Sequence, residues 1–364
     1  MMPGMRTTPA RLPRSGALAG RIAPTIARFP TPWLVLAAAW MVLPSGTAQA
    51  TEPVRLAMEI LGAEAQVEVR GMERTAATSA VRRALLEIHE MANLLDPQSG
   101  TEGGLGMLQG AAGRASVELD PRVGSFLVRA MQYCLWSSNA FGPLGGQVYQ
   151  LWDVNDRSGK TPHPFDLRQA VASAECAALR VETGDVPQAA LAEGSRLSAF
   201  GMDRGMATDR AIEVLEEHGV ENAFVEIGTV VRAIGGGPDG RGWLVAIPGV
   251  EGTRNPLEQV WLLDGSLAIV RRSPEGSAAR PRPSNLRTGV PARGVVQVAA
   301  VSELAIDTQA LATTLFVVGL TEGQRLLGAL DPRPSVFWLL GTGSGVPLES
   351  TYRWSELRRL DRNR

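Results

Sequence analysis

Hydrophobic and polar positions recur along the chain with two different periods. A period of two over residues 65–70 predicts a strand, and an apolar stripe from Val81 to Leu95, with steps of four and three, predicts a helix over 72–95. His89 falls outside that stripe, so we expect it to be solvated. Further helices are predicted from the Asp120–Pro121 N-cap pair to about residue 138, from Asp166 onward, over 206–218 with Gly219 after its end, and over 306–318.

Short strands separated by turns dominate the second half of the chain. They are predicted over 222–227, 229–234, 242–247, 258–263, 265–270, 295–301 and 335–340. Residues 99–114, 153–165 and 273–293 are rich in Gly, polar residues or Pro, and are predicted to be loops. Helices mixed with such strands predict an α+β fold of mixed, largely antiparallel sheets with flanking helices, in lobes of roughly 51–196 and 197–364.

The first fifty residues differ from the rest in charge. They contain five Arg and no acidic residue, followed by the apolar run Trp33–Leu43 and by Ala48-Gln49-Ala50. This order is typical of a secretory signal peptide with an A-x-A cleavage site. A retained membrane anchor is the less favoured alternative, because a membrane span needs about twenty apolar residues. Since no Cys lies at the cleavage site, we expect release into a periplasm-like compartment without a lipid anchor.

Composition narrows the chemistry of residues 51–364. They carry 31 basic and 37 acidic residues, and this net charge of −6 lacks the excess of basic residues that is typical of nucleic-acid-binding proteins. Lys160 is the one lysine, and the arginines that supply the other positive charges cannot act as general bases. Cys134 and Cys176 are the only cysteines, and export permits a disulfide between them. Cys134 also lies on an apolar helix face, so a buried free thiol remains the alternative.

Three segments, in this order, carry a family resemblance. The first is residues 139–143 (NAFGP) followed by Leu151-Trp152. The second begins with residues 204–211 (RGMATDRA), and the third ends with residues 310–319 (ALATTLFVVG). From about Ala57 to the C-terminus the chain thus resembles the FAD:protein FMN transferases, long called thiamine-biosynthesis lipoproteins.

The resemblance implies a chemistry and a set of sites. Members of that family split FAD with the help of Mg²⁺ and attach FMN through a phosphoester to a Thr of a partner flavoprotein. FAD is therefore implied as substrate or ligand, Mg²⁺ as cofactor, and an exported or membrane-associated flavoprotein as partner. The matching positions place flavin binding at Ala140, Phe141, Ser198, Arg204 and Arg282, and metal binding at Gly201, Gln309 and Thr313.

This chain departs from the family at several charged positions. The family's acid in A-F-D is Gly142, and its metal-binding Asp is Gln309, whereas the Thr that follows survives as Thr313. A Gln offers an oxygen but no charge, and Mg²⁺ prefers carboxylates and phosphates. The family's leading Asp and its Lys become Ser198 and Arg204, and its His and Asp become Arg282 and Asn285. Arg204, Arg282 and Arg287 are candidates to hold a phosphate without cleaving it.

These substitutions lead to the hypothesis that FMN transfer is weak or lost, and no catalytic residue is assigned. Two other hypotheses stay open: a non-catalytic flavin-binding or flavoprotein-assembly factor, and an interaction module that has lost its ligand. Individual positions also have structural interpretations. Gly205 and Gly228 suit turns, Asp209 a solvated helix surface, and Thr313 core packing.

Overall fold

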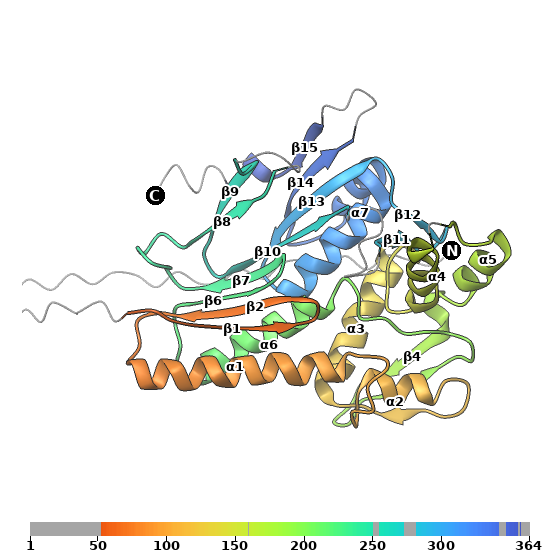
Figure 1. The fold of residues 1–364 in the computed structure, drawn as a ribbon, viewed down its shortest axis with the longest axis horizontal. Coiled ribbons are helices and arrows are strands. Elements are labelled where there is room, and N and C mark those ends of the chain that lie inside the picture. The colour runs from red at the N-terminus through yellow and green to blue at the C-terminus, as the bar shows by residue number, and fades with distance from the viewer. Residues whose placement is uncertain are drawn as a thin grey trace, which may run out of the picture. The chain divides into compact units, whose positions relative to one another are not determined.

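The computed structural model describes residues 52–158, 160–249, 255–272, 282–341, 347–355 and 357, and Figure 1 shows their arrangement. The predicted export segment and residues 273–281 of the predicted loop 273–293 lie outside these residues. None of the described helices is both long and apolar enough for a membrane span.

The main sheet is antiparallel throughout. Within the described residues it has eight strands in the order β1-β2-β6-β7-β10-β13-β14-β15, and every pair of neighbours is antiparallel. Its strands are β1 (Val54–Ile60), β2 (Ala63–Val69), β6 (Ala223–Ile227), β7 (Val230–Ile234), β10 (Gly265–Arg271), β13 (Val295–Ser302), β14 (Ser335–Leu340) and β15 (Leu348–Tyr352). This arrangement confirms the predicted α+β class.

Both faces of the sheet are covered, as Figure 1 shows. Three helices lie on one face: α1 (Arg74–Leu94), α6 (Asp203–Glu217) and α7 (Ala305–Leu327). The hairpin of β8 (Trp243–Ile247) and β9 (Glu258–Leu262) lies over part of the other. Successive strand residues point to opposite faces. Val230 therefore packs in the core on the helix side, and Val231 packs in the second core beneath the hairpin.

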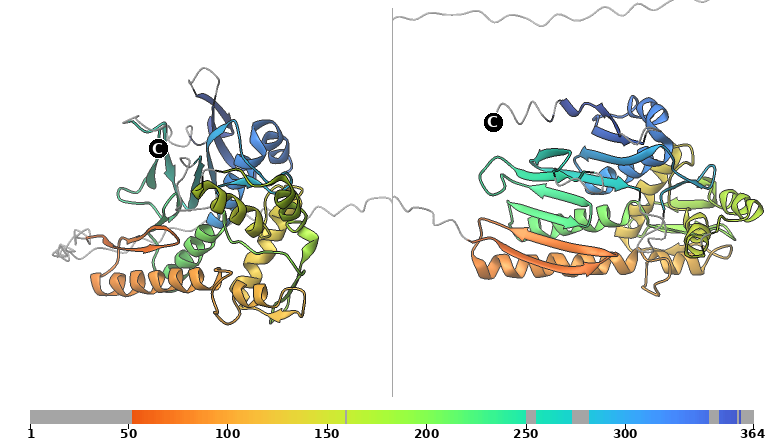
Figure 2. Two further views of the ribbon diagram at one scale, coloured as in Figure 1. Left: turned by 45° about the vertical axis from the view of Figure 1, so that its right-hand side comes forward. Right: turned by 45° about the horizontal axis from the view of Figure 1, so that its top comes forward.

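The remaining elements gather beside one end of the main strands (Figure 2). They are α2 (Leu105–Gly110), β3 (Val117–Glu118), α3 (Pro121–Trp136), α4 (Gly146–Arg157), α5 (Pro164–Ala172), the 3₁₀ turn η1 (Cys176–Ala178), β4 (Leu179–Glu182), β5 (Gln188–Leu191), β11 (Ser284–Asn285) and β12 (Val290–Pro291). Helix α3 packs against α7 and so carries the turn at residues 137–143 to the candidate site.

The predicted helices and strands in the second half are confirmed, apart from the end of one helix. Two predicted loops and two helix boundaries in the chain differ from the structure. The predicted loop 99–114 contains α2, because Gly106 there allows close packing: a Cβ at this position would lie 1.7 Å from the Ser99 carbonyl oxygen. The predicted loop 153–165 is helical up to Arg157, and the next helix begins at Pro164 instead of Asp166. Helix α7 continues past the predicted end to Leu327, with a break at Gly319, whose φ is +77°.

Cys134 and Cys176 form a disulfide that joins α3 to η1 across 42 residues of sequence. Replacing both cysteines with alanine is expected to lower the free energy of unfolding by about 4 kcal/mol, because the crosslink restricts the unfolded chain. Urea unfolding measures the loss, and dithiothreitol should destabilise the parent protein but not the variant. Equal unfolding midpoints for parent and variant would contradict the prediction.

Candidate functional site

Helix α7 is the scaffold of the predicted metal site. Gln309 and Thr313 lie one turn apart on it, and both side chains are buried. The Thr313 hydroxyl donates to the main-chain oxygen of Gln309 at 2.8 Å. That hydrogen bond lies within the helix, so it is also the contact expected of a Thr that serves only the core.

A turn before α6 brings the predicted flavin and metal positions together. Gly201 has a φ of +85°, which favours glycine. A Cβ on Gly201 would lie 2.8 Å from Cε2 of Phe141 and 3.0 Å from Cγ2 of Thr313. Three predicted positions, Phe141, Gly201 and Thr313, are thus in contact, although they come from three distant parts of the sequence.

The Gln309 amide is held by α6 at both ends. Its Oε1 accepts from the Gly205 main-chain N–H at 2.7 Å, and its Nε2 donates to Oδ1 of Asp203 at 3.2 Å. Because a main-chain N–H only donates, the oxygen of the amide must face Gly205. Gly205 is therefore a close-packing residue of α6, not a turn glycine, and a Cβ there would lie 2.4 Å from the Ala305 carbonyl oxygen.

These contacts test whether Mg²⁺ fits the predicted position. Mg²⁺ requires oxygen ligands in near-octahedral geometry. The Gln309 oxygen is engaged by Gly205, and the Gln309 nitrogen faces Asp203, the nearby carboxylate. No group of three or more His, Cys, Asp or Glu side chains with metal-binding spacing occurs in the part of the chain that the structure describes. The residues present do not fit a divalent cation at this position.

Hydrogen bonds fix the turn at residues 137–143 against two other segments. The main-chain oxygen of Ala140 accepts from Leu286 N–H at 3.0 Å, and Ser198 N–H donates to the Pro143 oxygen at 2.8 Å. Gly142 replaces the acid expected from the resemblance, and a Cβ there would lie 2.7 Å from both Cβ and Sγ of Cys134. The disulfide therefore leaves little room for any side chain at position 142.

Arg204 and Arg287, two candidates for phosphate binding, both make hydrogen bonds to protein groups. Arg204 is buried, and its Nη2 donates to the Leu61 and Gly62 carbonyls of the β1–β2 turn at 2.9 and 3.2 Å. Arg287 makes two hydrogen bonds to the Glu322 carboxylate at 2.9 and 2.8 Å. Both guanidinium groups thus hydrogen-bond to protein partners.

Asp209 is a buried structural residue, and the prediction of a solvated helix surface was wrong. It is 4% exposed. Its Oδ1 accepts from Arg232 at 2.7 Å and from Ala305 N–H at 2.8 Å, while its Oδ2 accepts from Ile306 N–H at 2.8 Å. Burial raises the pKa of the Asp209 carboxyl, and Arg232 and the two amides oppose that rise. The carboxylate thereby caps α7 and joins it to α6 and β7.

Arg282 lies in a cleft of about 510 Å³ close to the predicted site. Arg272 and Arg293 also line it, together with the aromatic residues Trp152 and Phe316. Phe316 follows Thr313 by one turn of α7, so the cleft adjoins the cluster described above. Arg272 and Arg293 were not predicted as site residues, although the high proportion of Arg in residues 271–293 was a visible signal.

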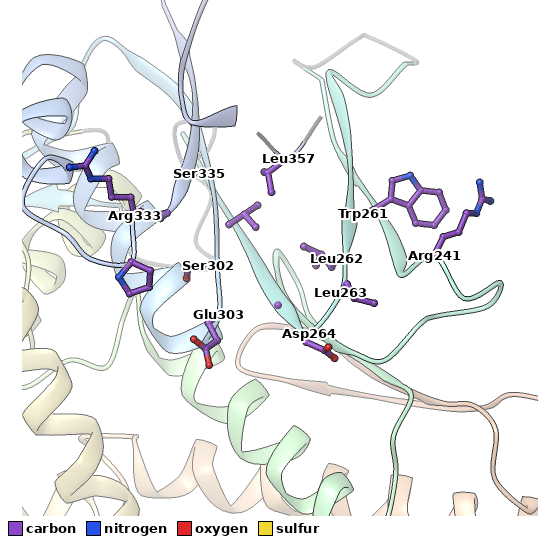
Figure 3. A pocket seen from close by; sticks show the side chains of 14 residues that line it. Arg241, Trp261, Leu262, Leu263, Asp264, Ser302, Glu303, Arg333, Ser335 and Leu357 are labelled. Atoms are coloured by element: carbon purple, nitrogen blue, oxygen red, sulfur yellow. The ribbon is translucent and has the colours of Figure 1, made fainter. Parts of the chain in front are cut away.

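A second hollow, of about 530 Å³, lies between β9 and the segment before β14 (Figure 3). In Figure 3, Leu262 and Leu263 line it from the hairpin, and Glu303 and Arg333 line it from the opposite side. None of the predicted flavin or metal positions is among its described lining residues. The arginine-lined cleft is therefore the better candidate for the functional site.

Comparisons with known proteins agree on one family. The model described as the ApbE family matches residues 61–337. A FAD:protein FMN transferase of Treponema pallidum (strain Nichols) is 24% identical over 182 residues, which is 48% of this chain and 50% of the relative. A FAD:protein FMN transferase of Rhodobacter capsulatus is 26% identical over 317 residues, which is 81% of this chain and 58% of the relative. The chain thus spans between half and three fifths of the length of these curated relatives.

The fold also matches a solved structure. The ApbE protein from Thermotoga maritima superposes with a TM-score of 0.71 at 20% sequence identity. The match covers 84% of this chain and 99% of that one. At this identity the likeness establishes the fold and leaves the chemistry to the residues of the site.

Proposed function

The chain belongs to the ApbE family, and we propose that it is an exported flavin-binding protein whose FMN transfer to a partner flavoprotein is weak or absent. FAD is its proposed ligand, since the relatives are FAD:protein FMN transferases. The order of charged, apolar and small residues in residues 1–50 supports export to a periplasm-like compartment. The Cys134–Cys176 disulfide is in keeping with an oxidising environment.

One observation carries the proposed loss of transfer: the Gln309 amide is held where the resemblance implies a metal-binding carboxylate. Cleavage of a diphosphate requires its developing charge to be neutralised. Gln309 brings no negative charge to attract a cation, and its oxygen is already used by Gly205. Arg282 stands where the resemblance implies a His, and a guanidinium does not accept a proton at neutral pH.

We expect the purified protein to quench FAD fluorescence equally well in EDTA and in millimolar Mg²⁺. The physical reason is that no described residue cluster fits the cation. In the same samples, a flavoprotein domain with an acceptor Thr should gain no covalently bound FMN, as read by in-gel flavin fluorescence and intact mass. A Mg²⁺-dependent mass increase of one FMN on that Thr would overturn the proposed loss of transfer. A failure to bind FAD at all would overturn flavin binding.

A working transferase is the second candidate function, and the position of the Asp203 carboxylate favours it. Its Oδ1 lies 3.2 Å from Nε2 of Gln309, so one carboxylate remains beside the predicted metal position. If Asp203 recruited Mg²⁺ together with the phosphates of FAD, the transfer assay above would detect turnover. An Asp203→Asn variant would then lose that turnover.

A further inference from the structure

Strand β1 forms one outer edge of the main sheet (Figure 2). It pairs with β2 through seven consecutive residues without a register shift, and no other strand of the described residues pairs with its outer side. Such an edge presents unpaired main-chain N–H and C=O groups that can bind another strand. Proline and β-bulges, which commonly protect edges, do not occur in Val54–Ile60. Strand β1 is therefore a candidate docking surface for an extended segment.

The hydrogen bonds of β2 identify the residues of β1 that face the free edge. The main-chain oxygen of Glu64 accepts from Gly228 N–H at 3.0 Å, and Arg70 N–H donates to the Asn222 oxygen at 3.0 Å, so the even-numbered residues in and next to β2 bond toward β6. Because this direction alternates along an antiparallel strand, the odd-numbered residues of β2 bond toward β1. In the observed register they face the even-numbered residues of β1. The main-chain groups that point outward are therefore those of Arg55, Ala57 and Glu59.

The sequence of β1, VRLAMEI, is complementary to itself in the opposite direction. When a second copy lies antiparallel about a two-fold axis at Ala57, Arg55 of each copy stands opposite Glu59 of the other. All three outward-pointing residues then meet outward-pointing residues, as an antiparallel ladder requires. A register shifted by two residues keeps that ladder, but it sets Arg55 or Glu59 opposite Ala57 and loses both charge pairs. Apolar residues also meet in the two-fold register: Leu56 meets Met58, and Val54 meets Ile60.

The charges within one copy leave the Glu59 end of β1 acidic. Glu59 lies directly opposite Glu64 of β2, and neither carboxylate makes an ion pair or a side-chain hydrogen bond with another described residue. Like charges in directly opposite positions of a ladder destabilise it. Burial and then the Glu64 carboxylate raise the pKa of the Glu226 carboxyl on β6, while Arg55 opposes that rise. A cation beyond the edge would relieve this repulsion.

Arg55 lies at the other end of β1 and can supply that cation to a second copy. Within its own chain it pairs with the buried carboxylate of Glu68, to which its Nε donates at 2.9 Å. Its side chain is nevertheless 58% exposed. A guanidinium has five N–H donors, so Arg55 can keep the contact with Glu68 and also bind a carboxylate across the free edge.

We infer that β1 pairs with β1 of a second copy of this chain, in the register that sets Arg55 of each copy opposite Glu59 of the other. The main sheets of the two copies then form one continuous antiparallel sheet. This inference is independent of flavin binding and goes beyond the proposed function. Seven residues from each copy are fewer than the roughly 20–30 residues a side of a standard interface, so we expect a weak dimer that forms in the micromolar range.

Sedimentation velocity over a micromolar concentration series tests for the dimer. The purified protein is expected to pass from monomer to dimer as its concentration rises, and added salt should weaken the dimer because exposed ion pairs contribute to it. Ala57→Pro should remain a monomer, since proline removes the outward N–H at the two-fold axis but is tolerated on an edge strand. Circular dichroism checks that this variant is folded. A parent protein that stays monomeric across the series would overturn the inference.

A charge reversal tests the two ion pairs. Glu59→Arg is expected to weaken the dimer by about tenfold, because it sets a cation opposite Arg55 at both ends of the ladder. The monomer should be at least as stable as the parent, since the new cation faces Glu64 of its own chain. Glu349→Arg is the matched control: Glu349 is exposed on β15, the opposite edge strand of the described sheet, and its reversal should leave the dimer unchanged. A dimer that Glu349→Arg disrupts and Glu59→Arg does not would place the interface at the other edge.

A disulfide crosslink between the copies tests the register. The two native cysteines are joined to each other, so a cysteine introduced by substitution is the one free thiol of the chain. In the inferred register the Ala57 residues of the two copies form a hydrogen-bonded pair with Cα atoms about 5.5 Å apart, which is within the reach of a disulfide. Oxidised Ala57→Cys should therefore give a covalent dimer about tenfold faster than Glu349→Cys, the control for random collisions. Equal rates, or a solution dimer that survives Ala57→Pro, would show that the copies associate through another surface.

Discussion

Replacing Asp209 with alanine is expected to lower the free energy of unfolding by about 3–5 kcal/mol, because it breaks a buried ion pair on one side only. Arg232, whose side chain is 13% exposed, would be left without its carboxylate. The first main-chain N–H groups of α7, those of Ala305 and Ile306, would lose their shared acceptor. Urea unfolding followed by circular dichroism measures the loss.

The control for this substitution lies on the same helix. Glu213→Ala removes a carboxylate that is 45% exposed and paired with Arg210, and it should cost less than about 1 kcal/mol. Combining Asp209→Ala with Arg232→Met should recover part of the stability, because no unpaired charge then remains buried. If Asp209→Ala unfolds at the same urea concentration as Glu213→Ala, the carboxylate does not hold α6, α7 and β7 together.

Local sequence patterns predicted the second half of the fold well, because its strands are short, apolar and separated by tight turns. The predicted strands 222–227 and 229–234 correspond to Ala223–Ile227 and Val230–Ile234. The turn between them contains Gly228, whose φ is +63°. Edge strand β1 was missed although its apolar residues alternate with exposed ones, which is the period-two pattern of a half-buried strand. Helix α2 was missed because a sequence does not distinguish a glycine that permits close packing, such as Gly106, from a glycine in a loop.

The sequence allowed the residues of the candidate site to be predicted, but not the contacts that these residues make. The resemblance identified Phe141, Gly201 and Thr313, and the structure brings these three together. It could not show that Gln309 contacts Asp203 and Gly205, because these residues are 106 and 104 positions away in the sequence. The burial of Asp209 was hidden for the same reason, since its partners come from β7 and the start of α7. The ligand-binding roles of the predicted positions stay predictions.

Replacing Gln309 with aspartate is expected to make the protein respond to Mg²⁺. The substitution removes the amide that donates to Asp203 and sets a second carboxylate beside it. Two adjacent carboxylates repel one another without a cation, and Mg²⁺ relieves that repulsion while gaining oxygen ligands. Millimolar Mg²⁺ should raise the thermal unfolding midpoint of the variant and tighten its FAD binding by about tenfold or more, equivalent to at least about 1.4 kcal/mol. The parent protein should show neither effect.

Gln309→Asn is the control for this last prediction, because it has the length of aspartate without the charge. It should lose the contacts of Gln309 and gain no response to Mg²⁺. Adding Asp203→Asn to Gln309→Asp should abolish the response, since one carboxylate is then removed. A parent protein that Mg²⁺ already stabilises would show that Asp203 alone recruits the cation and would favour the working transferase. An unresponsive Gln309→Asp variant would show instead that the missing charge at position 309 is not what keeps the cation out.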